Sequence, residues 1–116
     1  MGCGSAAITS FTTQAQAQVP ATPGAPYLAA QYCEGSGDYA GVAQVCVAPV
    51  DGATLYNWVN SVSGAELGTT SSSCITLTGL YSGPGGAFFH VKVQAGNAAG
   101  WSAYGPGVDI AFDQTC

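Results

Sequence analysis

Residues 88–101, FFHVKVQAGNAAGW, constrain the fold of this chain more than any other stretch. Apolar residues occupy the odd positions from Phe89 to Ala95, and polar residues occupy the even positions between them. This period of two is typical of a strand with one face on a core and the other towards solvent. Turn-forming residues follow at 96–100, and a second extended run begins at Trp101. The stretch therefore predicts a central antiparallel strand that ends in a hairpin.

The rest of the chain predicts further short strands. Gly, Pro, Ser and Asp gather between the apolar runs, and no stretch shows the period of an amphipathic helix. Seven strands are expected, in residues 27–33, 42–47, 54–59, 65–70 and 74–80, from residue 88, and in residues 108–112. Short strands that alternate with turns indicate an all-β sandwich.

The last strands resemble those of the fibronectin type III family. The resemblance rests on an aromatic residue, three alternations and an alanine, followed by Asn-Ala-Ala-Gly-Trp-Ser and then Tyr104. It extends over residues 20–113 and implies a seven-stranded immunoglobulin-like sandwich. Two positions depart from the family's pattern. Val47 replaces a tryptophan, and Phe89 replaces a tyrosine whose hydroxyl would bond the backbone.

Length and charge limit the classes of function. A chain of 116 residues forms one domain, with the sandwich expected in residues 20–116 and an extended arm in residues 1–19. Six acidic residues against the single base Lys92 give a formal net charge of −5. A nucleic-acid binder needs clustered Lys and Arg, so that class is excluded. No run approaches the roughly 18 apolar residues of a membrane span, so membrane insertion is not expected.

Neither catalysis nor a metal or other cofactor is expected. The alternation puts His90, the sole histidine, on the solvent face beside Lys92, and no acidic residue lies near it in sequence. The acidic residues are scattered over turns and ends, where Asp38 and Asp51 serve as turn formers. Glu34 and Asp38 offer oxygen ligands for calcium, but their loop lacks the spaced acidic pattern of such sites. The chain is therefore not expected to be an enzyme.

Five cysteines in a short chain favour an extracellular or cell-surface protein. The fold that the resemblance implies makes the strands of Cys46 and Cys74 neighbours, and both side chains then point outward. An intrachain disulfide between them is the first choice, with Cys33 as a competing partner for Cys46. Cys3 and Cys116 lie near the chain ends and, with Cys33, are candidates for bonds to another molecule.

The N-terminal arm has the alternation of a strand with one weakly apolar face. That face carries Phe11, Ala15, Ala17 and Val19. We expect the arm to add to the sheet edge of a neighbouring copy, because strand addition satisfies exposed backbone groups directly. A bond from Cys3 to Cys116 or Cys33 would lock the contact, and a head-to-tail filament would result. The alternative is that Cys3 belongs to a cloning remnant and the arm is a linker.

Two aromatic residues are candidate ligand contacts, because aromatic rings can stack on sugars or on peptide partners. Trp101 and Tyr104 follow the predicted hairpin turn, whereas core packing is expected for Trp58 and Phe89. The expected function is a secreted structural or adhesive module that self-associates into an extracellular filament. The alternative is an accessory domain that binds a carbohydrate or a protein.

Overall fold

A computed structural model describes residues 18–116. The described residues form eight β-strands and no helix, so no helix among them could cross a membrane. In chain order the strands are β2 (Tyr27–Cys33), β3 (Gly41–Cys46), β4 (Leu55–Val59), β5 (Glu66–Thr70), β6 (Cys74–Leu80), β7 (Ala87–Asn97), β8 (Gly100–Trp101) and β9 (Val108–Phe112). The predicted all-β class is confirmed.

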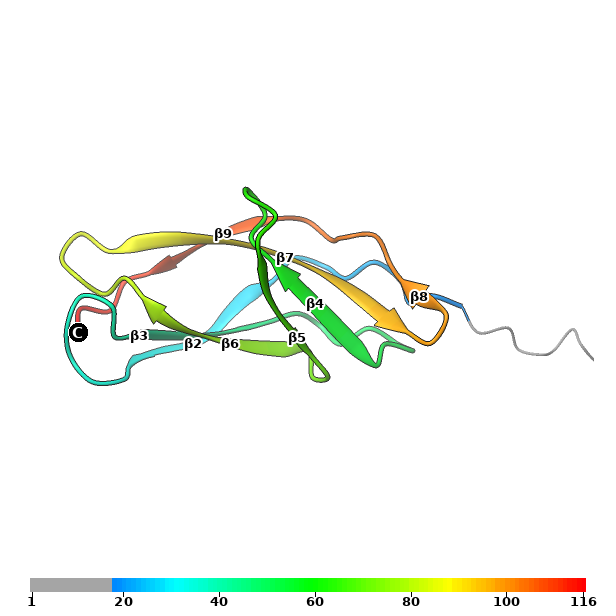
Figure 1. Cartoon of the computed structure of the whole chain (residues 1–116), viewed down its shortest axis with the longest axis horizontal. Helices are drawn as coiled ribbons and strands as arrows, with labels where there is room; N and C mark the ends of the chain where they lie inside the picture. The colour runs from blue at the N-terminus through cyan, green and yellow to red at the C-terminus, as the bar shows by residue number, and fades with distance from the viewer. Residues whose placement is uncertain (1–17) are drawn as a thin grey trace, which may run out of the picture.

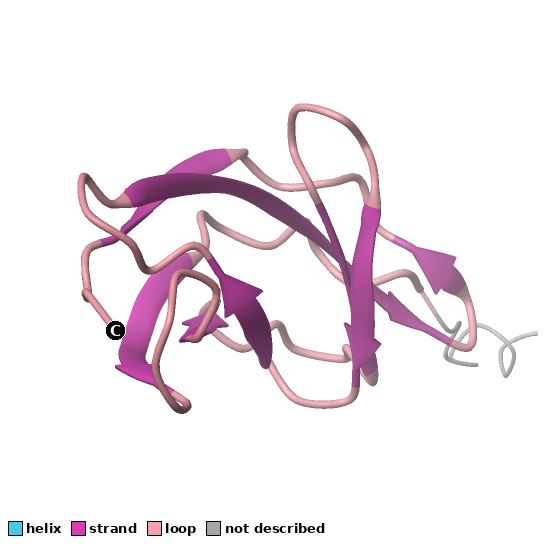
Figure 2. Ribbon diagram, turned by 60° about the vertical axis from the view of Figure 1, so that its left-hand side comes forward, coloured by secondary structure: helices cyan, strands magenta, loops and turns pink. Residues whose placement is uncertain are grey.

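The strands form two antiparallel sheets that face each other. The smaller sheet has the order β2-β3-β6, and the larger has the order β5-β4-β7-β8, with β9 also paired to β7. Figure 1 shows β2, β3 and β6 along one layer and β7 with β9 along the other. Figure 2 shows the layers from a second direction, with every connection a loop or turn. β3 and β6 are neighbours, as the resemblance implies.

The core lies between the sheets and follows the predicted alternation. Val91, Val93 and Ala95 on β7 are completely buried. Trp58 on β4 is also completely buried, and its indole Nε1–H donates a 2.9 Å hydrogen bond to Thr70 Oγ1. Valine and isoleucine side chains of the smaller sheet complete the cluster. The period of two in the central strand therefore places every second side chain of β7 in the core.

The extended run predicted from Trp101 is interrupted, although the strand expected at residues 108–112 has the bounds of β9. β8 ends at Trp101 and β9 begins at Val108, and residues 102–107 between them follow β7 without regular pairing. The backbone N–H groups of Ser102 and Gly105 still donate to carbonyls of β7, at 2.7 and 2.9 Å. Pro106 has no N–H to offer to a sheet. The turn is also tighter than expected, because β7 continues to Asn97 and only residues 98 and 99 remain outside the strands.

A proline segment, residues 18–26, packs along this interrupted strand. Its three prolines, Pro20, Pro23 and Pro26, are all buried, and a spacing of three matches the repeat of a polyproline helix. A Cβ on Gly105 would collide with the carbonyl of Pro23, so the two backbones approach closely there. The described chain thus begins beside the β7–β8 turn and ends at the opposite pole (Figure 1).

Candidate binding face

One disulfide lies within the smaller sheet. Cys46 of β3 and Cys74 of β6 are direct partners in the strand register, with their Cα atoms 4.0 Å apart, and their sulfurs are bonded. This is the pairing that the neighbouring strands led us to expect. Cys46 shares the outward parity of Gln44, but it is 5% exposed whereas Gln44 is exposed.

The second disulfide overturns the expected intermolecular role of Cys33 and Cys116, because these two cysteines are bonded to each other. The tail after β9 turns back towards the end of β2. Gln31 Nε2 donates to Asp113 Oδ1 at 2.5 Å, and Asp113 N donates to Gln31 Oε1 at 3.1 Å. These bonds bring Cys116 to Cys33 across a sequence separation of 83.

The predicted arm falls mostly beyond the described part of the chain. Cys3, Phe11, Ala15 and Ala17 lie outside the described residues. Val19 lies inside them and is 47% exposed. Its Cγ1 would contact a Cβ added at Gly100, so Val19 lies beside the β7–β8 hairpin. The preceding carbonyl, of Gln18, accepts a 2.7 Å hydrogen bond from Asn97 Nδ2.

The outward side of the larger sheet gathers the other candidate residues. We call it the outer face, and it comprises Leu55, Asn57, Thr69, Lys92, Gln94, Gly96, Trp101 and Tyr104. The members on β4 and β7 alternate with the buried core residues, so the sequence pattern already assigns them to this side. Lys92 is the only charged member of the set; His90 and Asp109 lie on the same side of the sheet, further along β7 and on β9.

Trp101 lies flat on the sheet at one end of the outer face. A Cβ built on Gly96 would lie 2.5, 2.7 and 2.8 Å from the indole atoms Cε3, Cζ3 and Cδ2. Three similar distances to adjacent ring atoms mean that the ring covers Gly96 with its face, since an edge approach would make them unequal. The residue is 44% exposed, and because Gly96 covers one ring face, the opposite face is the side left to solvent. Leu55, the partner of Gly96 on β4, is 40% exposed beside it.

Asn57 organises the polar part of the outer face. Its Oδ1 accepts a 3.1 Å hydrogen bond from Thr69 Oγ1 on β5. Its Nδ2 donates to Gln94 Oε1 at 3.2 Å and to Tyr104 Oη at 3.1 Å. One amide therefore connects side chains from β5, β7 and the segment after β8. We refer to these four residues as the Asn57 network.

Two further contacts restrain the network. Gln94 Nε2 donates a 3.0 Å hydrogen bond to the carbonyl of Ser102. Lys92 Nζ lies 4.7 Å from the centroid of the Tyr104 ring, within the range of a cation–π interaction. Even so, the network keeps hydrogen-bonding capacity, because Gln94 retains a second amide hydrogen, Tyr104 its hydroxyl hydrogen, and Thr69 its oxygen lone pairs.

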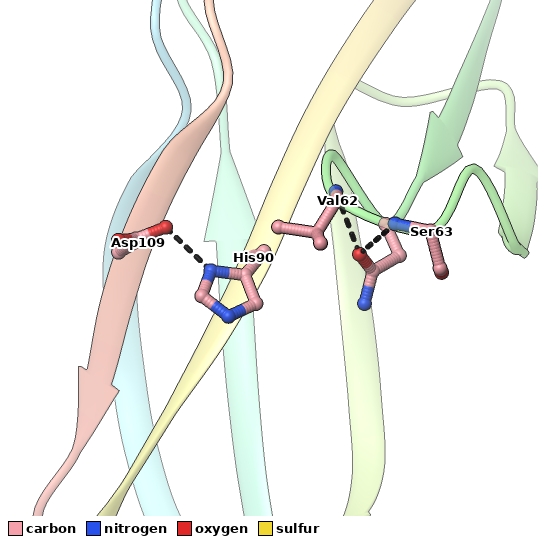
Figure 3. A network of polar contacts seen from close by, with 5 residues as sticks. Val62, Ser63, His90 and Asp109 are labelled. Carbon is pink, nitrogen blue, oxygen red and sulfur yellow. Dashed lines mark hydrogen bonds and ion pairs between the residues drawn. The ribbon is translucent and has the colours of Figure 1, made fainter.

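His90 has an acidic neighbour that the sequence did not reveal. The register of β7 and β9 places it opposite Asp109, and His90 Nδ1 lies 2.5 Å from Asp109 Oδ1 (Figure 3). The view also includes the turn at Val62 and Ser63, whose backbone N–H groups donate to Asn60 Oδ1. The two side chains are 34% and 66% exposed, and an exposed pair of this kind stabilises a fold by about 1 kcal/mol at most.

His90 and Asp109 do not extend into a larger polar centre. Within residues 18–116, no three His, Cys, Asp or Glu side chains lie close enough to share a metal ion. The disulfide-bonded cysteines offer no thiol to His90. The geometry therefore gives a local surface pair on β7 and β9, separate from the Asn57 network.

No family model matches the sequence, and no curated protein sequence matches it. Solved structures match it by shape. The crystal structure of FN3tt superposes with a TM-score of 0.62 at 16% identity, over 84% of this chain and 98% of that chain. This chain has a fibronectin type III-like fold. The fibronectin type III domain of human fibronectin type III domain containing protein 3 gives a TM-score of 0.55 at 16% identity, over 86% of this chain and 92% of that one.

The fibronectin type III-like fold also occurs inside larger chains. The glycoside hydrolase domain structure of Endo-D from Streptococcus pneumoniae R6 matches with a TM-score of 0.60 at 20% identity. That match covers 86% of this chain but 16% of the other, so it concerns one part of a much longer protein. The fold and the two disulfides are compatible with an extracellular protein.

Proposed function

We propose that this domain is a non-catalytic adhesive module of the extracellular space and that it binds its ligand through the outer face. The Asn57 network is the observation that carries the proposal. Its side chains come from separate elements and are held in place by bonds to one another, while parts of them stay accessible. Side chains that are ordered before binding lose less conformational entropy when a ligand arrives.

The fold supports a module that keeps its shape outside the cell. The Cys46–Cys74 bond links β3 to β6, and the Cys33–Cys116 bond links the C-terminal tail to β2. Domains of the fibronectin type III kind are typically non-enzymatic modules. A binding face on a rigid sheet is also better positioned than one on loops, because hydrogen-bonded strands restrict its side chains.

An adhesion measurement tests the proposal. Beads coated with the full-length protein are passed over surfaces that carry polysaccharide or protein, and the retained fraction is counted. Asn57→Ala removes the centre of the network and should lower retention several-fold. Tyr32→Ala is the matched control, because Tyr32 is 50% exposed on β2 of the other sheet. The proposal fails if neither surface retains the wild type, or if Asn57→Ala is retained as well as the wild type.

Assembly into an extracellular filament is a second candidate function, and the positions of the described chain ends favour it. Gln18 lies at the pole of the β7–β8 turn, and Cys116 is fixed at the other pole. Residues 1–17 therefore join the described domain at the pole opposite Cys116, an attachment point that suits head-to-tail strand addition. Light scattering in solution should show polymers for the full chain and monomers after deletion of residues 1–17. Equal masses would refute this candidate.

A further inference from the structure

We propose that the ligand of the outer face is a neutral glycan and that the Trp101 indole is the surface on which one sugar ring stacks. This inference rests on the proposed function, because it names the ligand class of the same face. Three features carry it: the orientation of the indole, the hydrogen-bonding capacity beside it, and the low charge of the residues around both.

The indole is held as a flat apolar platform. One ring face lies against the Gly96 backbone, and no Cβ intervenes to tilt it. Trp101 is 44% exposed, so the other ring face is the side available for a ligand. Leu55 continues the apolar surface on the next strand, in register with Gly96. A sugar ring presents C–H groups on its faces, and these pack favourably on the electron-rich face of an aromatic ring.

The Asn57 network forms a row of polar side chains beside the Trp101 indole, and this row can bind the hydroxyl groups of a sugar. Gln94 precedes Gly96 by two residues on β7, which places the row about 7 Å along the strand from the glycine under the indole. A hydroxyl group both donates and accepts hydrogen bonds. The row offers both roles, with donors on Gln94 and Tyr104 and an acceptor on Thr69. Their existing bonds to Asn57 leave these groups in place for the ligand.

The charge and shape of the face distinguish among ligand classes. Lys92, the one charged member of the outer face as defined, is engaged with the Tyr104 ring, while His90 and Asp109 pair with each other further along β7 and on β9; the chain as a whole carries −5. A polyanionic glycan would be repelled by this net charge. Proline-rich peptides also stack on aromatic rings, but they dock in aromatic-lined grooves. The indole lies flat on Gly96, and such a platform suits the face of a sugar ring better.

Titration with defined sugars tests the inference. Full-length protein is titrated separately with hexamers of β-1,4-linked glucose, N-acetylglucosamine and mannose, and binding is followed by calorimetry. Acrylamide quenching of tryptophan fluorescence is measured in parallel. Trp58 is completely buried, so the quenchable emission comes from Trp101. We expect at least one hexamer to bind and to protect this emission from the quencher.

Variants of Trp101 test whether the sugar binds on its indole ring. Trp101→Ala should weaken the affinity at least about tenfold, as expected when a central aromatic contact is removed. Trp101→Phe should lose less, because a smaller ring can still cover Gly96. Tyr32→Ala on the other sheet should bind like the wild type. The near-UV circular dichroism of buried Trp58 checks that each variant is folded.

Several outcomes would overturn the glycan assignment. These are no binding of any hexamer, equal affinity of Trp101→Ala and the wild type, tighter binding of a sulfated glycan, or binding of a proline-rich peptide in place of the sugars. Each leaves the adhesive proposal standing if beads still require Asn57 for retention on a protein surface. Loss of that requirement on every surface would instead reject the proposed function itself.

Discussion

Cys33, the last residue of β2, is bonded to Cys116, the last residue of the chain. β2 belongs to the smaller sheet, whereas the tail that carries Cys116 follows β9 of the larger one. The bond therefore joins the ends of two layers at one pole. The Cys46–Cys74 bond differs, because it joins neighbouring strands within a single sheet.

Removing the Cys33–Cys116 bond should destabilise the domain strongly. With a sequence separation of 83, the chain-entropy model gives a contribution of about 4.5 kcal/mol, against about 3.5 kcal/mol for the separation of 28 in the other bond. The double variant Cys33→Ser with Cys116→Ser should lower the free energy of unfolding in urea by about 3 to 4.5 kcal/mol. Cys3→Ser is the control, because it breaks neither bond. An unchanged urea midpoint in the double variant would contradict the prediction.

The two disulfides also limit covalent assembly to dimers. The chain has five cysteines, and four of them are consumed in pairs, which leaves Cys3. One thiol per chain can link two copies and no more. A non-reducing gel of the oxidised protein should show monomers and dimers without a ladder, and Cys3→Ser should abolish the dimer. A ladder of higher species would mean that one of the intrachain bonds exchanges between copies.

The sequence predicted local features well because they depend on neighbouring residues. The bounds expected for residues 27–33 and 74–80 are those of β2 and β6, and the alternation through Val91 and Val93 located the buried wall. Hydrophobic periodicity is a property of a single strand, so one sequence is enough to detect it. Trp101 was chosen as a candidate contact for its place after the predicted hairpin turn, and that choice stays a prediction.

The features that escaped prediction depend on contacts between distant residues. His90 and Asp109 are brought together by the register of β7 with β9, and no local signal fixes that register. The return of the tail to Cys33 likewise depends on the path taken after β9. Gly96 was interpreted as a turn residue, although a glycine opposite an aromatic residue across a short hairpin is a recognisable pair.

Adding a side chain at residue 96 should dislodge the indole. A Cβ there would overlap the ring of Trp101, so Gly96→Ala should cost about 1 kcal/mol and expose the ring further. Acrylamide quenching of fluorescence should therefore rise. Gly24→Ala is the matched control, since a Cβ at Gly24 meets no atom within 4 Å. Equal quenching of Gly96→Ala and the wild type would show that the ring is not held on the glycine.

The buried indole hydrogen bond should contribute to stability separately from packing. Thr70→Val keeps the shape of the side chain but leaves the Nε1–H of Trp58 without its 2.9 Å acceptor in the core. An unsatisfied buried donor costs about 1 to 3 kcal/mol, and urea unfolding should show a loss of this size. Thr69→Val is the comparison on the same strand. Thr69 is exposed, so its replacement should cost less. Equal losses in the two variants would contradict the assignment.

Asn97 should prove essential as a hydrogen-bond donor at the pole where the described chain begins. Its Nδ2 donates to the carbonyls of Gln18, at 2.7 Å, and Gly52, at 3.2 Å, while its Oδ1 accepts from the backbone of Ala99. Asn97→Asp keeps the acceptor but replaces the donor with a carboxylate that faces two carbonyl oxygens. It should lower stability by about 1 to 3 kcal/mol and release the proline segment, so that proteolysis near Gln18 becomes faster.

Asn60 supplies the matched comparison for this substitution. Its Oδ1 accepts from the backbone N–H groups of Val62 and Ser63, at 2.8 and 2.9 Å, and this role needs only an acceptor. A carboxylate can take the same two bonds, so Asn60→Asp should change the free energy of unfolding little. The contrast between the two variants isolates the donor function of Asn97 from the general effect of adding a negative charge to a chain that already carries −5. Equal destabilisation by the two substitutions would assign the loss to charge and would remove the case that Asn97 anchors the proline segment.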